Sequence, residues 1–442
     1  MTLSKADRQI LHIALPSIVS NITVPLLGLV DLTIVGHMGS AAYIGAIAVG
    51  SMVFNVIYWI FGFLRMGTSG LTSQALGRRQ LGEAATLLVR SLMVALAIGG
   101  TIVALQVPLG HIAIAAARPT ADIAMPTRAY FSICVWGAPA MLSLYGLTGW
   151  FIGMQDTRTP MLVAIVQNVV NIAASLTFVY GFGMKVEGVA LGTLVAQYAG
   201  LAMAAELWRR HYGRRLAGKV EWHGVCSRDK MKRFFCVNRD IFLRTLFLVA
   251  VNFYFLSAGA AQGAVVLAVN TLLMQLFTLF SYVMDGFAYA GEALCGRLYG
   301  AQAHEAFGRM VRRLFSWGAL LTAAYTLVYA LGGSSFLALL TSDGTVVAAA
   351  SHYMAWAVLI PAAGAAAFIF DGVFIGITDT RGMLVSSGVA AAVFFALYAA
   401  LCPQLHNHAL WIAFLSFLFM RGAVQAFIYA RAQKRGTNAA RR

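Results

Sequence analysis

Hydrophobic residues run along this chain in long stretches, each closed by a short polar or charged segment. Each stretch has about 20 residues, enough to cross about 30 Å of hydrocarbon as a helix. The strict alternation of polar and apolar residues that marks barrel strands does not occur. Backbone amides and carbonyls need internal hydrogen bonds in lipid, so we expect helices. The twelve predicted spans cover residues 10–35, 44–66, 86–108, 125–150, 160–182, 188–208, 238–258, 264–290, 311–331, 352–376, 384–402 and 409–430.

The composition supports the same class of protein. Hydrophobic residues make up 60% of the 442 positions and charged residues only 11%, whereas soluble domains carry about 25% charged residues. The first stretch is too long for a signal peptide, contains Asp31, and is followed by no small-residue cleavage site. Five cysteines are scattered without a CxxC pair, which indicates reduced structural thiols.

Basic residues sort between alternate loops. One side carries the run 209–239 and the tail 431–442, while the other side carries few basic residues. The positive-inside rule therefore predicts that both termini are cytoplasmic, and the net charge of +16 is mainly a topology signal. The basic stretch is interpreted as a cytoplasmic linker that touches anionic lipid headgroups, and not as a nucleic-acid interface.

An internal repeat divides the chain. Gly149–Arg158 (GWFIGMQDTR) and Gly372–Arg381 (GVFIGITDTR) are related by an offset of 372 − 149 = 223. The same offset relates Gly77 to Gly300, Arg90 to Arg313, Tyr130 to Tyr353 and Gly36 to Gly259. Six spans is an even number, so the halves are predicted to be parallel repeats that rock to open a cavity to alternate sides. The alternative is a duplicated structural scaffold.

The repeat sets the predicted domain boundaries. An N-terminal six-helix lobe covers residues 1–210, and a basic cytoplasmic linker covers 211–237. A C-terminal six-helix lobe covers 238–430, followed by a basic cytoplasmic tail at 431–442. The GxxxG pairs that begin at Gly149 and Gly372 predict close helix packing within the chain, in preference to dimerisation.

Asp31 is the sharpest functional candidate. It lies in the outer part of the first span, and no basic residue lies within one or two helical turns. An acid at the bilayer centre costs about 2.5 kcal/mol or more, so such residues usually face a cavity and mark function. Burial favours the neutral form of a carboxyl group, and a group of this kind can take a proton outside and release it inside. The alternative is a permanently protonated acid that only hydrogen-bonds a neighbouring helix.

Polar residues in spans five and six are candidate partners of Asp31. Asn168, Asn171 and Ser175 are spaced to share one helix face, and Thr193 lies in span six. These side chains are predicted to contact Asp31 or to supply oxygen ligands to a cation. Interhelical hydrogen bonding alone is the other interpretation.

Further charged residues lie near the inner ends of other spans. Asp285 and Glu292 share one face of span eight, with Tyr289 between them. Arg65, near the inner end of span two, is predicted to pair with Glu292 or Asp285 across a cleft, either as a gate or as a static pair.

Two more features concern the second half. Asp240 and Arg244 are four residues apart, which predicts a local ion pair. Asp371 stands where the repeat has Thr148, which indicates a specialised C-terminal half and makes Asp371 a candidate cleft residue.

Several catalytic signatures are absent from the sequence. There is no GxxxxGK[ST] loop, HExxH motif, Cys/His cluster at metal spacing, GxSxG elbow or Rossmann fingerprint. The chain is therefore predicted to be neither an enzyme nor a cofactor or metal protein. An ion gradient or the substrate gradient is the expected driving force.

Several segments together resemble the multidrug and toxic compound extrusion (MATE) family over about residues 5–430. These are LPSIVSNITVPLLGLVDLTIVGHMG, RMGTSGLTSQALG, GWFIGMQDTRTP, NRDIFLRT and DGFAYAGEALCGRLYGA, and the last two point to the DNA-damage-inducible protein F (DinF) branch. The resemblance implies an all-α polytopic membrane protein in the bacterial cytoplasmic (inner) membrane. It implies twelve transmembrane helices in two pseudo-symmetric six-helix bundles around a V-shaped central cleft.

The resemblance also implies cation-coupled antiport of organic, often cationic or amphipathic, compounds. In the DinF branch the acid of the first span is the proton site, and Asp31 occupies that position. Asn171 and Thr193 match polar residues around that acid. Ser175 stands where some prokaryotic relatives have a second acid, which leaves Asp31 as the main carrier. Family members use either protons or sodium.

The sequence therefore predicts a monomeric proton-coupled, or alternatively sodium-coupled, exporter of small organic substrates that contacts membrane lipids and no nucleic acid. A flippase for lipid-linked precursors is the nearest rival, although it usually has a strongly cationic cleft, whereas the intramembrane charges here lean acidic. A membrane scaffold or sensor without transport is the rival from another class.

Overall fold

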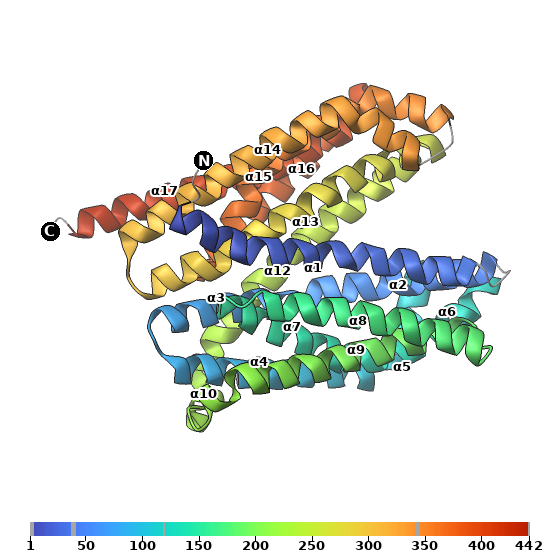
Figure 1. Cartoon of the computed structure of the whole chain (residues 1–442). Coiled ribbons are helices and arrows are strands. Elements are labelled where there is room, and N and C mark those ends of the chain that lie inside the picture. Colours follow the sequence, from blue (N-terminus) through green and yellow to red (C-terminus); the bar gives the residue numbers. More distant parts are fainter. Residues whose placement is uncertain (1–3, 37–40, 118–119, 341–343, 441–442) are drawn as a thin grey trace. The chain divides into compact units, whose positions relative to one another are not determined.

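The computed structural model describes residues 4–36, 41–117, 120–340 and 344–440, and this part of the chain is helical with no strand. Figure 1 shows the helices along the chain. The first half contains α1 (Lys5–Gly36), α2 (Ala41–Phe61), α3 (Phe63–Gly77), α4 (Leu81–Ala104), α5 (Gln106–Ala117), α6 (Ala121–Cys134), η1 (Val135–Gly137), α7 (Ala138–Gly153), α8 (Arg158–Leu176), η2 (Thr177–Gly181) and α9 (Val186–Trp208). The linker contains η3 (Arg209–Gly213), α10 (Arg214–Leu216) and α11 (Trp222–Val225). The second half contains α12 (Arg228–Ala261), α13 (Ala264–Gly300), α14 (His304–Leu340), α15 (Gly344–Ile377), α16 (Thr380–Leu405) and α17 (Asn407–Ala440).

The prediction of twelve spans is confirmed. Within the described residues, eleven helical stretches are long and apolar enough to cross a membrane, and α1 adds a helix of 32 residues. Eight of the predicted spans each lie within one helix, and several of these helices are longer than the spans. For example, α12 begins at Arg228, ten residues before the predicted start at 238, because its first turns are polar and extend beyond the apolar stretch. The other four spans run across two or more helical segments; they are 44–66, 86–108, 125–150 and 160–182.

The chain forms two compact units. The N-unit is Leu15–Asn238, and the C-unit is Met1–Ala14 together with Arg239–Arg442. In the N-unit, α7 packs on α3 and α4, and α8 packs on α9. In the C-unit, α15 packs on α13, α14 and α17, and α16 packs on α17 (Figure 1). Residues 4–14 were predicted to belong to the N-terminal lobe, but they group with the C-unit.

The two units repeat the same helix contact, as the internal repeat predicts. Gly149 of α7 lies against the backbone of Arg65 in α3, and Gly372 of α15 lies against the backbone of Ala288 in α13. Both contacts obey the offset of 223, since 288 − 65 = 223. A Cβ atom added at either glycine would overlap the facing carbonyl oxygen. The prediction of close packing within the chain at the GxxxG pairs is therefore confirmed.

The conserved spacing of the repeated motif also builds the same turn twice. Gln155 and Thr378 have positive φ angles of 67° and 56°, which is typical of the residue that ends a helix. The acid that follows accepts a hydrogen bond from a first-turn amide of the next helix. Asp156, one residue before the N-cap Thr157, accepts from the Thr159 amide, and the N-cap Asp379 accepts from the Gly382 amide, both at 3.1 Å. The DTR part of the motif is therefore explained by helix termination and capping.

The start of α1 is held in the C-unit by an acid. Asp7 Oδ1 accepts a hydrogen bond from Trp317 Nε1 of α14 at 3.1 Å, and Asp7 Oδ2 accepts one from Ser4 Oγ at 2.6 Å. The Arg313 guanidinium lies 3.9 Å from the same carboxylate. The hydrogen bond from Ser4, followed by that from Trp317, lowers the pKa of Asp7 although burial opposes the shift.

Candidate ion-coupling site

Asp31 is a buried acid on α1 in the N-unit. Its exposed fraction is 8%, and Oδ1 has no hydrogen-bond partner among the described residues. The basic residues of α1 are confined to its beginning, and none lies in its last turn. The carboxyl group thus lies in a buried setting without a cationic partner among the described residues.

Polar residues of α8 and α9 bond to each other, and their predicted contact with Asp31 or a cation stays a prediction. Asn171 Nδ2 donates to Thr193 Oγ1 at 3.1 Å, and Thr193 Oγ1 donates to the Val189 carbonyl at 3.1 Å. Asn171 and Ser175 are fully buried, and Asn171 Oδ1 and Ser175 Oγ have no partner among the described residues. Unpaired buried oxygens cost free energy, so these two atoms are candidate acceptors or donors for an ion or a bound water.

Asn168 has a different partner from its neighbours on α8. Its Nδ2 donates to the Thr23 carbonyl of α1 at 3.1 Å. The contact joins α8 to α1 through the backbone, eight residues before Asp31. This position fits interhelical hydrogen bonding.

Several further polar residues of the same unit are buried near these helices and were not predicted from the sequence. Tyr130 and Ser51 of α2 have hydroxyl oxygens 3.3 Å apart, and Cys134 Sγ donates to the Ala190 carbonyl at 3.8 Å. Gln197 is also buried, and its Oε1 has no partner among the described residues. Two signals were present: Tyr130 belongs to the repeat, and Gln197 follows Thr193 by one helical turn.

The C-unit carries a different arrangement at the repeat-related positions. The offset of 223 relates Asp31 to Tyr254, Asn171 to Phe394 and Ser175 to Tyr398. The Tyr254 ring lies 6.1 Å from Phe394 and 5.5 Å from Tyr398, both edge-on. Three aromatic residues, with Tyr254 in contact with the other two, therefore occupy the positions that correspond to the polar residues of the N-unit.

The buried charge of the C-unit is centred on Asp371 of α15. Its carboxylate accepts hydrogen bonds from Arg244 of α12 and Arg421 of α17, and from Gln425 Nε2 at 2.7 Å. The Arg244 and Arg421 side chains are only 6% and 5% exposed. Asp371 is therefore neutralised by two guanidinium groups.

This cluster corrects one prediction. The local pair of Asp240 with Arg244 is wrong, since Arg244 bonds to Asp371 instead. Asp240 binds its chain neighbour Arg239 at 2.9 Å and the Thr380 hydroxyl at 3.2 Å. Asp240 and Arg244 are close in sequence, but Asp240 contacts Thr380 of α16 and Arg244 contacts Asp371 of α15.

The remaining predicted site residues lie on α13 and α3. Asp285 and Tyr289 are half-buried on α13, Glu292 on the same helix is 1% exposed, and Arg65 on α3 is 9% exposed. All four take part in interactions within the protein. The pairing of Arg65 with Glu292 or Asp285 would join the two units, and it stays a prediction. The described residues contain no group of three or more His, Cys, Asp or Glu side chains that could hold a metal ion.

The fold defines a class: polytopic α-helical membrane proteins built from two homologous six-helix halves. DNA damage-inducible protein F of Escherichia coli (strain K12) is 37% identical over 439 residues, covering 98% of this chain and 94% of that protein. Multidrug resistance protein MdtK of Edwardsiella ictaluri (strain 93-146) is 22% identical and 92% of each chain is covered. A crystal structure described as MATE in the bent conformation has a TM-score of 0.87 at 19% identity, with 99% of this chain and 97% of that chain covered.

A family model described as MatE matches residues 16–177 and 241–401, once in each half. The chain belongs to the MATE family, whose members are transporters of small organic substrates and not enzymes. The resemblance to the DinF branch is confirmed by the identity to the Escherichia coli protein. MATE transporters are driven by ion gradients and not by bound cofactors.

Proposed function

We propose that this chain is a secondary active antiporter that exports organic, often cationic or amphipathic, compounds in exchange for protons. In this proposal Asp31 carries the proton, and the two lobes alternate their access to the two sides of the membrane. The observation that carries it is the buried Asp31 carboxyl group, whose Oδ1 has no partner among the described residues. Sodium is the alternative coupling ion.

The contrast with Asp371 supports the choice of Asp31. A carrier must gain and lose its ion at little cost, whereas Asp371 is held by two guanidiniums and an amide. Protonating Asp371 would leave two buried cations without their acceptor, which is strongly unfavourable. Asp31 forms no such ion pair with described residues, so protonating Asp31 does not deprive a buried cation of its carboxylate.

The repeat supports a polar site around Asp31. Tyr254 contacts both Phe394 and Tyr398 in the C-unit, so the helices of the N-unit should bring Asp31 to a similar spacing from Asn171 and Ser175. The unpaired oxygens of Asn171 and Ser175 would then hydrogen-bond the protonated carboxyl group or a water bound to it.

Orientation and surroundings are part of the proposal. The basic linker and tail favour cytoplasmic termini in a bacterial inner membrane. The name of the relative MdtK supports a broad range of drug-like substrates. A monomer surrounded by lipid suffices for the two-lobe mechanism.

The test uses the full chain in liposomes loaded with a fluorescent organic cation, with the pH gradient and the sodium gradient imposed separately. Wild-type protein should move the cation when the pH gradient alone is imposed. Asp31→Asn should abolish this movement, because an amide cannot carry the proton. Asp122→Asn is the matched control, since Asp122 is an exposed acid in the first turn of α6, and it should transport like wild type.

Each outcome separates the proposals. Wild-type rates in Asp31→Asn would overturn the proton role of that residue. Transport that follows only the sodium gradient would establish the alternative ion. Scrambling of a labelled lipid-linked precursor without cation movement would favour the flippase, and no exchange of any cargo would favour the scaffold or sensor.

A further inference from the structure

A basic cavity of about 750 Å³ lies at one end of the N-unit spans. It is formed where α3 ends, where α4 and α12 begin, and where the linker passes beneath them. Its basic lining residues are Arg78, Arg79, Arg90, Lys219, Lys230 and Arg233. Glu83 and Glu221 are its acidic residues, so the lining carries a net charge of 6 − 2 = +4. We call this cavity the basic pocket.

Two of the six cations, Lys230 and Arg90, already have partners within the protein. Lys230 Nζ lies 2.5 Å from Glu83 and 3.0 Å from Glu221, so both acids of the pocket are already paired. The buried Arg90 donates to two backbone carbonyls of α11 at 3.0 and 2.6 Å. These bonds fix the linker and the start of α12 against α4, and they leave the other four cations to face the cavity.

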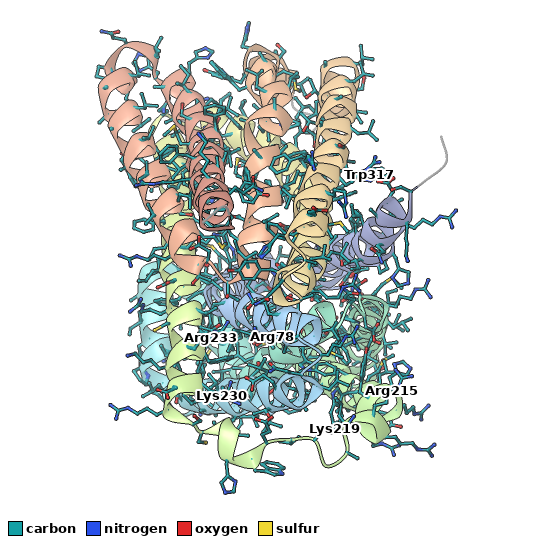
Figure 2. All side chains as sticks on the ribbon, turned by 90° about the vertical axis from the view of Figure 1, so that its left-hand side faces the viewer. Arg78, Arg215, Lys219, Lys230, Arg233 and Trp317 are labelled. Carbon is teal, nitrogen blue, oxygen red and sulfur yellow. The ribbon has the colours of Figure 1, made fainter. Side chains whose placement is uncertain are left out.

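Those four cations are not neutralised by an ion pair with any residue that the structure describes. Arg78, Arg79, Lys219 and Arg233 form no ion pair with a carboxylate in the described part of the chain. Arg78 and Arg233 are neighbours (Figure 2), and their hydrogen bonds go to neutral glutamine side chains at 3.0 and 3.2 Å. Burial and then the charge of Arg233 lower the pKa of Arg78. An anion between the two guanidiniums would remove their repulsion.

The first turn of α4 adds to the positive field. The residue that begins the helix, Gln80, makes no side-chain capping bond, and a helix start carries partial positive charge on its free amides. An added Cβ at Gly82 would lie 2.9 Å from the Lys219 carbonyl oxygen, so glycine lets the linker close directly over this turn. Leu71 and Phe234 are buried beneath, as an apolar floor.

We propose that the basic pocket binds a phosphate group. The apolar floor of the pocket and its place at the ends of the spans favour the headgroup of an anionic phospholipid as the source of that phosphate. Planar guanidiniums and free amides are the donors that suit phosphate oxygens. The proposal concerns a site apart from Asp31 and depends on neither the coupling ion nor the direction of transport.

The test measures lipid binding by the full chain in detergent, from its thermal midpoint and from lipids retained in native mass spectrometry. Phosphatidylglycerol, phosphatidylcholine and inorganic phosphate are added separately. Wild-type protein should retain phosphatidylglycerol and gain stability from it, and phosphatidylcholine should do neither. Arg78→Gln/Arg233→Gln should weaken the apparent affinity about 10- to 30-fold, since each basic residue near an anionic lipid contributes about 1 kcal/mol. Arg233→Gln alone should give a smaller loss.

Arg214→Gln/Arg215→Gln is the matched control. It removes the same charge from two exposed residues of α10 that do not line the pocket, of which Figure 2 labels Arg215. This variant should bind like wild type. Equal affinities in the pocket variant and the control, or equal binding of the two lipids, would overturn the proposal. If inorganic phosphate stabilises the protein and displaces the lipid, the phosphate site stands and its natural ligand is soluble. If only the lipid does so, the source is the membrane.

Discussion

Replacing Asp371 by Asn should destabilise the protein strongly. The side chain keeps its volume, but it loses the negative charge that holds Arg244 and Arg421. Both guanidinium groups would then stay buried without a carboxylate acceptor. Removing one partner of a buried ion pair costs about 3–5 kcal/mol, which is a factor of more than about 100 in the ratio of folded to unfolded protein.

The measurement is the free energy of unfolding in mixed micelles, from tryptophan fluorescence along a denaturant titration. Glu305→Gln is the control, because Glu305 pairs with Arg309 at 3.5 Å on the surface with a side chain that is 92% exposed. It should change stability by about 0.5 kcal/mol or less. Arg421→Gln combined with Asp371→Asn restores the charge balance, so the double variant should be more stable than the sum of the single effects predicts, by at least about 1 kcal/mol.

Two results would refute this reasoning. One is an unfolding free energy of Asp371→Asn within about 0.5 kcal/mol of wild type. The other is strict additivity in the double variant, which would mean that the two side chains do not interact. The variant also separates stability from coupling: the folded fraction should still move cargo with the pH gradient, because Asp31 is intact.

Two further predictions concern packing and acidity. Gly149→Ala and Gly372→Ala should each lower stability by about 1–3 kcal/mol, because the new methyl group overlaps a facing carbonyl. Gly100→Ala should not lower stability, because the space beside Gly100 is open. The thermal midpoints of the three variants check this prediction. Asp7→Asn should cost about 1 kcal/mol at neutral pH through its hydrogen bonds. Because the folded-state pKa of Asp7 is lowered, its contribution is present above the usual carboxyl pKa and is lost as the pH falls below about 4. A gap to wild type that stays constant down to pH 3 in unfolding midpoints would contradict the second prediction.

The sequence predicts the spans well because their signal is local. A helix that crosses lipid needs an apolar stretch of a set length, and that length can be counted. The short helix α5 (Gln106–Ala117) was not predicted as a separate helix, because counting apolar residues does not show where one helix ends and the next begins. It continues the apolar run of α4, and hydrophobicity alone does not distinguish one long helix from two.

The partners of buried charges could not be predicted in this way. Sequence spacing paired Arg244 with Asp240 four residues away, yet its true partner Asp371 is 127 residues distant. Arg421 and Gln425 complete that cluster from 50 and 54 residues beyond Asp371. Such contacts are set by which helices pack together, and an offset between repeats carries no information about residues that differ between the halves.

The differences between the halves are where the chemistry lies. At the positions of Asp31, Asn171 and Ser175, the second half has the aromatic residues Tyr254, Phe394 and Tyr398. At the position of Asp371, the first half has Thr148, and Tyr198 stands where the second half has Arg421. The shared helix contacts at Gly149 and Gly372 let both halves keep one framework. On that framework the first half holds an acid without a cationic partner among the described residues, and the second holds an acid that two cations neutralise. Under the proposed mechanism, coupling runs through the first lobe alone, so changing the number of protons moved for each substrate would require a second titratable group in the C-unit.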